Sequence, residues 1–229
     1  MNSILKLFSI FSSFIFPQNC FICNVSGQEI CPDCLKNLES ARPRCLKCGR
    51  ENPFGIYCTI HCRKFQADAV HAPFAFKGPL RELVHQLKYE DVTNLVRPLS
   101  SEITRLAKRI PDYHKFVLTY IPLARKRLLE RGYNQSELIA EAVSEVLKTP
   151  VSGLLTRVEG HLTQVQLGDK KMRRQNVKGV FKIKQGVEIP DNVILIDDVV
   201  TTGATVEEAA KVLKKAGVKK VVVLVLALA

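Results

Sequence analysis

All eight cysteines of the 229-residue chain lie between residues 20 and 62, in four close pairs. Two thiolates separated by two or three residues can face one tetrahedral metal ion from a single tight turn, and two such turns complete its shell. A segment this short buries too little apolar surface to fold without a staple. The pairs therefore predict two structural Zn²⁺ ions. Their expected ligands are Cys20, Cys23, Cys31, Cys34, Cys45, Cys48, Cys58 and Cys62.

The spacing allows two ways of sharing the four pairs between two ions. The first and second pairs can bind one ion and the third and fourth pairs the other, or the first pair can join the third and the second pair the fourth. His61, beside Cys62, is an alternative ligand at the least regular pair. A disulfide framework is the competing interpretation, but it is typical of small secreted domains, and the first sixteen residues do not resemble a cleavable signal peptide.

Residues 1–18 carry apolar side chains at helical spacing. This pattern predicts an amphipathic N-terminal helix that covers the domain or meets a partner, with weak membrane contact as the lesser alternative. Because the apolar run is too short to span a bilayer, we expect no transmembrane segment and a cytoplasmic protein, at most peripheral to the inner membrane. The expected division is 1–18 for this helix, 19–64 for a double zinc ribbon and 65–229 for a larger domain.

Beyond residue 65 the pattern alternates between strands and helices. This alternation predicts an α/β fold with a mostly parallel sheet flanked by helices. Residues 156–178 are polar, basic and without apolar periodicity, which is typical of a mobile loop. The expected strands are 69–76, 116–122, 180–184, 192–197 and 218–229, and the expected helices are 79–90, 93–109, 134–148 and one from about 203.

The helix over 134–148 has an expected start and an expected apolar face. Asn134 and Glu137 have the spacing of a capping box. The face consists of Leu138, Ile139, Ala142, Val143 and Val146.

Residues 193–205 read VILIDDVVTTGAT. The apolar run is that of a strand buried on both faces, so Asp197 and Asp198 fall at its carboxyl end, where open α/β sheets bind ligands. Small and hydroxylated residues at the start of the next helix suit an anion, because backbone N–H groups and the helix dipole attract negative charge. Carboxylates suit vicinal hydroxyls. Both preferences together predict a phosphorylated sugar as the ligand, whereas a mere helix cap is the simpler alternative.

This stretch resembles the phosphoribosyl pyrophosphate (PRPP) signature of the type I phosphoribosyltransferases. The resemblance implies that Asp197 and Asp198 receive the ribose hydroxyls. It also implies Mg²⁺ bound with PRPP. The residues implied to hold the 5′-phosphate are Thr201, Thr202, Gly203, Ala204 and Thr205.

Four further segments make the whole chain resemble the ComF family, zinc-ribbon proteins with a type I phosphoribosyltransferase-like domain that are linked to DNA uptake by competent bacteria. These segments are the cysteine pairs, HQLKYE at 85–90, IPLARKRLLERGYNQSELIA at 121–140 and TQVQLGDKKMRRQNVKGVFKI at 163–183. The resemblance implies that Arg125, Lys126 and Arg131 face the pyrophosphate. It further implies that 160–178 closes over the substrate with Arg173 and Arg174. A solvated basic face is the simpler interpretation of each cation.

Two functions remain open at this stage. The first is a phosphoribosyltransferase that releases pyrophosphate to an acceptor which the sequence does not name. The second is a non-catalytic scaffold of the uptake machinery that binds single-stranded DNA and partner proteins. The chain carries a formal net charge of +12, and residues 123–184 hold thirteen basic against six acidic side chains. This surplus attracts phosphates and is compatible with both functions.

Overall fold

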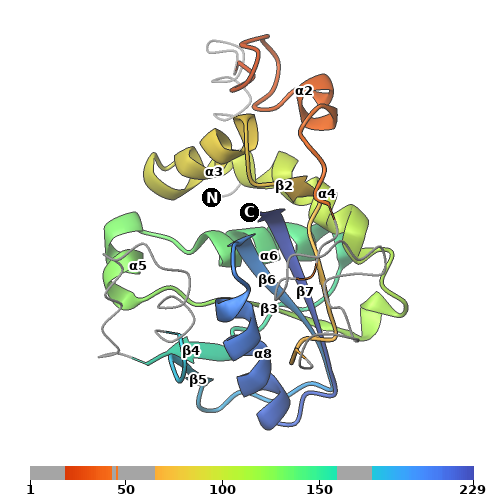
Figure 1. Ribbon diagram of the computed structural model, residues 1–229, viewed down its shortest axis with the longest axis vertical. Coiled ribbons are helices and arrows are strands. Elements are labelled where there is room, and N and C mark those ends of the chain that lie inside the picture. The colour runs from red at the N-terminus through yellow and green to blue at the C-terminus, as the bar shows by residue number, and fades with distance from the viewer. Residues whose placement is uncertain (1–18, 43–44, 46–64, 159–176) are drawn as a thin grey trace, which may run out of the picture.

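The computed structural model describes residues 19–42, 45, 65–158 and 177–229. Its centre is a five-stranded sheet with the order β1-β7-β6-β3, on which short β2 also pairs with β7 (Figure 1). All of these pairings are parallel. The expected mostly parallel α/β fold is therefore confirmed. The strands are β1 (Ala69–His71), β2 (Phe74–Ala75), β3 (Val117–Tyr120), β6 (Asn192–Val200) and β7 (Lys220–Leu228).

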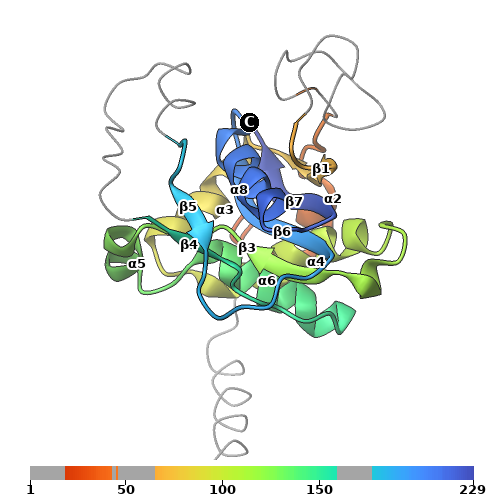
Figure 2. The same ribbon diagram turned by 90° about the horizontal axis from the view of Figure 1, so that it is seen from below.

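Helices cover both faces of the sheet (Figure 2). Alternate residues of β6 point to opposite faces, so that Ile194 packs with α4 and α6 while Leu195 packs with α8 and a small hairpin. The hairpin is formed by antiparallel strands β4 (Leu155–Arg157) and β5 (Phe181–Ile183). The helices are α2 (Pro32–Lys36), α3 (Pro79–Tyr89), α4 (Val96–Ala107), α5 (Arg125–Arg131), α6 (Gln135–Leu147) and α8 (Ala204–Lys215), with 3₁₀ turns at Thr93–Leu95 and Tyr113–Lys115.

Several expected elements differ from those observed. The strand expected over 69–76 is interrupted at Pro73, which has no N–H to donate to a ladder. The basic stretch after β3 forms helix α5. The stretch read as a loop over 156–178 begins inside β4, and its residues 159–176 lie outside the described part of the chain, as does the helix expected over 1–18.

The buried face of α6 also differs from the expected one. Ile139 and Val143 are buried as expected, whereas Val146 is 57% exposed. The buried stripe instead includes the polar residues Gln135 and Ser136 at the first turn. These two side chains face the carboxyl end of β6, described below.

Strand β6 is longer than its neighbour β3. The last pair between them joins Tyr120 to Ile196, but β6 continues along β7 as far as Val200. Asp197 and Asp198 therefore lie within β6 but beyond the end of β3, which leaves one side of the acid pair without a neighbouring strand. Among the described residues, no helix is long and apolar enough to cross a membrane.

Candidate functional site

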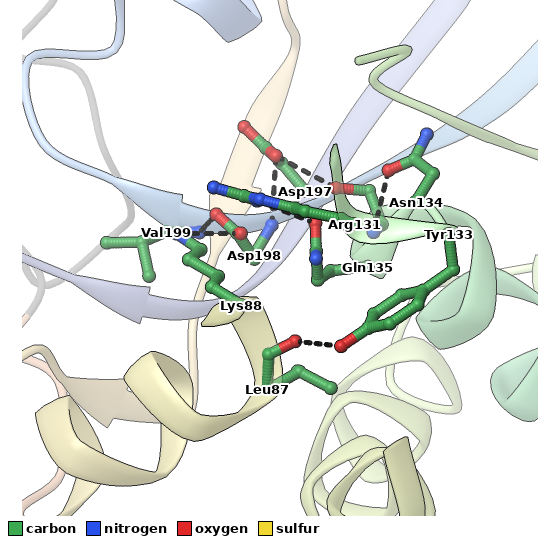
Figure 3. Close-up of polar contacts among 10 residues, drawn as sticks. Leu87, Lys88, Arg131, Tyr133, Asn134, Gln135, Asp197, Asp198 and Val199 are labelled. Carbon is green, nitrogen blue, oxygen red and sulfur yellow. Dashed lines mark hydrogen bonds and ion pairs between the residues drawn. The ribbon is translucent and has the colours of Figure 1, made fainter. Parts of the chain in front are cut away.

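The two adjacent acids of β6 form the centre of the candidate site. The carboxylate oxygen Oδ1 of Asp197 accepts hydrogen bonds from Ser136 Oγ at 3.0 Å and from the Asp198 N–H at 2.9 Å. Asp198 Oδ1 accepts from the Val199 N–H, and its Oδ2 lies 2.8 Å from the ammonium Nζ of Lys88 (Figure 3). Asp197 is 9% exposed, so the pair is held in a largely dry setting.

Lys88 supplies the counter-ion of the acid pair. Its side chain is 21% exposed and that of Asp198 is 15% exposed, so this ion pair is shielded from water. Two neighbouring carboxylates in a low-dielectric setting repel each other, and a nearby cation offsets that repulsion. Lys88 comes from the last turn of α3, far from β6 in the sequence.

Two contacts hold the last turn of α3 in place, and Figure 3 shows the first of them. The hydroxyl of Tyr133 donates to the carbonyl oxygen of Leu87 at 2.7 Å. The guanidinium of Arg131 lies 4.8 Å from the ring centre of Tyr89, within the range of a cation–π contact. Lys88, between these two anchored residues, therefore has little freedom to leave the acid pair.

Burial and the charge of Asp198 together raise the pKa of Asp197 to about 7. These effects outweigh the hydrogen bonds that Asp197 accepts and the charge of Lys88, both of which lower its pKa. Near neutral pH the acid pair is thus close to gaining or losing a proton. A ligand whose hydroxyls donate to both carboxylates favours the doubly ionised form.

The loop after β6 leads directly into α8. Gly203 caps α8 with a φ of 75°, a left-handed conformation that glycine adopts without strain. The Ala204 N–H points to Thr202 Oγ1 at 3.4 Å. Thr201 is exposed, and Thr205 is half-buried. The first N–H groups of a helix lack partners within it, which makes such a loop suited to a phosphate.

The first turn of α6 positions Ser136 against Asp197. The side chain of Asn134 accepts from the Ser136 N–H at 3.1 Å and donates to the carbonyl oxygen of Ile121 at 3.0 Å. It therefore caps α6 and fixes Ser136 against Asp197. The expected capping box is only half formed, because the carboxylate of Glu137 accepts a hydrogen bond from the Tyr120 hydroxyl.

The first four cysteines form a separate cluster. The ligand atoms of Cys20, Cys23, Cys31 and Cys34 all lie within 4.8 Å of one another, and none of the four is in a disulfide. The sulfur atoms of Cys23 and Cys31 are 3.7 Å apart. Zn–S bonds of about 2.3 Å place the sulfurs of a tetrahedral site about 3.8 Å apart. The cluster fits structural zinc and joins the first pair to the second; Cys48, Cys58 and Cys62 lie outside the described residues.

Comparisons with known proteins agree with both halves of this architecture. The family model described as "Double zinc ribbon domain" matches residues 11–63, and the one described as "Phosphoribosyl transferase domain" matches residues 134–229. Competence protein F of Haemophilus influenzae is 30% identical over 86% of this chain and 90% of its own length. The chain belongs to the ComF family.

Two further relatives align over most of their length. Competence protein ComFC of Streptococcus pneumoniae is 28% identical over 95% of this chain and 93% of its own length. DNA utilization protein YhgH of Escherichia coli O157:H7 is 31% identical over 86% of this chain and 85% of its own length. The ComF family thus accounts for the combination of a zinc ribbon with a phosphoribosyltransferase-like domain.

The cations expected around the ComF site fall into three groups. Arg131 contacts the first turn of α6, where its Nη1 donates to Gln135 Oε1 at 3.0 Å (Figure 3). Arg125 and Lys126 instead line a hollow on the other side of α5. Arg173 and Arg174 lie outside the described residues. Of the three cations that the structure describes, Arg131 is the one that contacts the first turn of α6, whose Ser136 binds Asp197.

Sequence reasoning missed two residues that touch the acid pair. Lys88 stands in HQLKYE, a segment that carried the resemblance to the ComF family but received no role of its own. Ser136 stands in the first turn of α6, where a polar side chain on an otherwise apolar face was the available signal. Both reach β6 from other elements, so that no spacing within one motif could have revealed them.

Proposed function

We propose that this protein binds PRPP and transfers its phosphoribosyl group to an acceptor. The observation that carries this proposal is the arrangement of β6 and α8. A buried acid pair, open on the side where β3 has ended, is followed within a few residues by a glycine-capped helix start. Vicinal hydroxyls suit the first feature and a 5′-phosphate suits the second. Asp197 and Asp198 then hold the ribose, and Thr201 to Thr205 hold the phosphate.

In this transfer the acceptor's nucleophilic atom forms a bond to C1 of the ribose, and the bond from C1 to the diphosphate oxygen breaks. The diphosphate departs with the electron pair, and the proton of the acceptor passes to water. Mg²⁺, when bound with PRPP, would supply positive charge to the diphosphate as it departs. The chain's own contribution is to position the ribose and to stabilise negative charge through Arg131.

The position of Lys88 defines a further part of the proposal. Its ammonium occupies one oxygen of Asp198, and the backbone N–H of Val199 occupies the other. Carboxylate oxygens have more than one lone pair, so each can still accept a ligand hydroxyl. Lys88 and the Val199 N–H therefore leave both oxygens of Asp198 able to accept a ligand hydroxyl.

The cellular role follows from the family. We propose a part in DNA uptake or utilization, in line with the printed names of the relatives, inside the cytoplasm and with contacts to other uptake proteins. The proposed division of the chain is 1–18, 19–64 and 65–229, with a second zinc ion bound by Cys45, Cys48, Cys58 and Cys62. In this proposal both ions are structural, because four protein ligands leave no open coordination position.

A second candidate function is a non-catalytic scaffold that binds single-stranded DNA. The supporting observation is helix α5, where four of seven residues are Arg or Lys. Binding through phosphates weakens steeply as salt is added, because counter-ions are released from the DNA. A steep salt dependence without any affinity for PRPP would favour this function over transfer.

Calorimetric titration of the full chain with PRPP and Mg²⁺ tests the main proposal. We expect saturable binding that Asp198→Asn weakens by about a hundredfold, because a charge-assisted contact is worth roughly 1.5–3 kcal/mol. Asp191→Asn is the matched control, since Asp191 also pairs with a lysine but on the surface. A folded wild-type protein that binds no PRPP at millimolar ligand would overturn the proposal.

A further inference from the structure

A large cavity lies between α5 and the β4–β5 hairpin, outside the acid pair. Its volume is about 1140 Å³, which exceeds the 300–1,000 Å³ typical of small-molecule pockets. Five of its lining side chains are cationic: Arg125, Lys126, Arg157, Lys182 and Lys184. We call this cavity the α5–hairpin groove.

The groove adjoins the proposed ribose site. Tyr120, which lines it, is the last residue of β3 and pairs with Ile196, the residue just before Asp197. Neighbouring strands lie about 4.8 Å apart, so the groove begins one strand away from the acid pair. The first turn of α6 serves both regions, because Ser136 reaches Asp197 while Glu137 reaches Tyr120.

A fixed polar pair stands in the groove. The Tyr120 hydroxyl donates to Glu137 Oε1 at 2.5 Å. Burial and the neighbouring Glu137 raise the pKa of Tyr120, so the hydroxyl keeps its proton and remains a donor. Gly153 leaves room for this arrangement, since a Cβ there would lie 2.9 Å from the Tyr120 hydroxyl oxygen. The one hydroxyl proton is used in this hydrogen bond, so the pair offers acceptor atoms, the Tyr120 oxygen and the second carboxylate oxygen of Glu137, to N–H groups of a ligand.

The three hairpin cations, Arg157, Lys182 and Lys184, have no counter-ion among the described residues. Arg157 lies 5.6 Å from the ring centre of Phe181, and burial, with the charge of Arg127, lowers its pKa. In the part of the chain that the structure describes, no carboxylate pairs with Arg157, Lys182 or Lys184. Like charges gathered in a concave site repel one another unless an anion enters. This arrangement favours a negatively charged ligand.

Apolar side chains complete the lining of the groove. Leu128 is 40% exposed and Leu129 is 76% exposed, and both face this cavity from α5. Leu155 and Ile183 line it from the hairpin. An apolar wall, a few fixed polar atoms and a cationic rim suit a ligand with a flat ring at one end and phosphate at the other.

We propose that the α5–hairpin groove is the acceptor site and that its ligand is a nucleoside phosphate, either free or at the end of a nucleic acid strand. The base lies on the leucine side beside Tyr120 and Glu137, and the phosphate lies against Arg157, Lys182 and Lys184. This inference rests on the proposed function, because an acceptor matters only if PRPP is bound. It names the class of acceptor that the sequence left open.

The test is a set of titrations on the full chain. The probes are the nucleoside 5′-monophosphates, the matching nucleosides, and a short single strand with and without a terminal phosphate. We expect the monophosphates to bind about tenfold more tightly than the nucleosides, because a charge-assisted contact to phosphate is lost. Lys182→Ala with Lys184→Ala should remove that preference, whereas Lys108→Ala with Lys215→Ala, which also removes two exposed lysines, should retain it.

PRPP with Mg²⁺ is titrated into the same samples so that the two proposals can fail separately. If PRPP binds but neither a monophosphate nor a phosphorylated strand end does, the acceptor site is wrong and the proposed function stands. Equal affinity for nucleosides and monophosphates also overturns it. Binding of the monophosphates identifies a free nucleotide as the source, and binding of only the phosphorylated strand identifies a strand end. If the wild type fails to bind PRPP, both the proposed function and the acceptor role of the groove are overturned.

Discussion

The acid pair and the α5–hairpin groove each bring like charges together, but they differ in the partners of those charges. Lys88 lies 2.8 Å from Asp198, while the hairpin cations have no carboxylate partner among the described residues. This difference indicates which kind of ligand each region suits. Carboxylates whose charge is partly balanced by a lysine suit a neutral donor such as a sugar hydroxyl, and cations without a carboxylate partner suit an anion.

The largest expected effect concerns a third cluster, the four cysteines of the zinc-ribbon segment. Cys31→Ser removes one of the sulfurs that lie within 4.8 Å of one another, and we expect loss of one zinc ion and unfolding of this segment. Structural zinc contributes about 10–16 kcal/mol in small zinc-dependent modules. Elemental analysis and limited proteolysis check this, with Ser26→Ala as the control. Full zinc content in the serine variant would show that Cys31 is not a zinc ligand.

Removal of the internal counter-ion should have the next largest effect. Lys88→Met leaves Asp198 buried beside Asp197 without a cation, which should lower the free energy of unfolding by about 3–5 kcal/mol. Lys219→Met breaks an exposed pair of similar length with Asp191 and should change it by about 1 kcal/mol or less. Urea unfolding of both variants measures the contrast. Equal effects would mean that the Lys88 pair is no better shielded than a surface pair.

The pH dependence of PRPP binding tests the proton on the acid pair. The raised pKa of Asp197, about 7, means that the side chain must lose a proton to accept a ligand hydroxyl. Affinity should therefore rise about tenfold between pH 6 and pH 8. In the free protein the sign is opposite: folding favours protonated Asp197, so this contribution to stability falls as pH rises from about 4 to about 7.

Asp197→Asn is the control for this pH dependence, since it retains the shape of Asp197 without its proton equilibrium. Its residual affinity should follow only the titration of the PRPP phosphates. If wild type and variant showed the same slope, the proton would belong to the ligand and not to the acid pair.

The smallest effect tests the polar pair in the groove. Gly153→Ala places a methyl group against the Tyr120 hydroxyl and should disturb its hydrogen bond to Glu137, at about 1–2 kcal/mol of stability. Nucleoside monophosphates should bind more weakly, while PRPP binding should not change. Ser152→Ala, one residue earlier, is the control. If both variants change stability and nucleotide affinity equally, the absence of a side chain at Gly153 does not determine the position of Tyr120.

The two regions also differ in how far the sequence could predict them. The acid pair and its phosphate loop lie within one run of thirteen residues, so strand, loop and helix could be read together. The groove joins α5, the first turn of α6 and both strands of the hairpin, which are brought together by tertiary packing. Arg157 and Tyr120 carry no local signal of their common cavity. Lys88 is similar, since it reaches Asp198 across more than a hundred residues of chain.

The fold was predictable where the apolar residues of a segment followed a single helical or strand pattern. Helix α8 buries Val206, Ala209, Ala210 and Leu213 as expected, and β6 and β7 read as continuous apolar strands. The errors fall where polar residues take buried positions. Gln135 and Ser136 are buried because they face the site. The buried stripe of α6 therefore includes these two polar residues, and Val146 is exposed to solvent. Propensity also missed α5, which has no buried residue to give it a periodic pattern.

Helix α3 shares a buried cluster with the zinc-ribbon segment and carries the lysine that pairs with the acid pair. Ile30 and Leu38, from the zinc-ribbon segment, belong to the same buried cluster as Leu80, Leu83 and Leu87 of α3. The next residue along the helix is Lys88, the counter-ion of Asp198. We therefore expect oxidation or metal loss at the cysteines to weaken the packing of α3 and to free Lys88 from Asp198. The acid pair would then respond to the redox state of the cysteines.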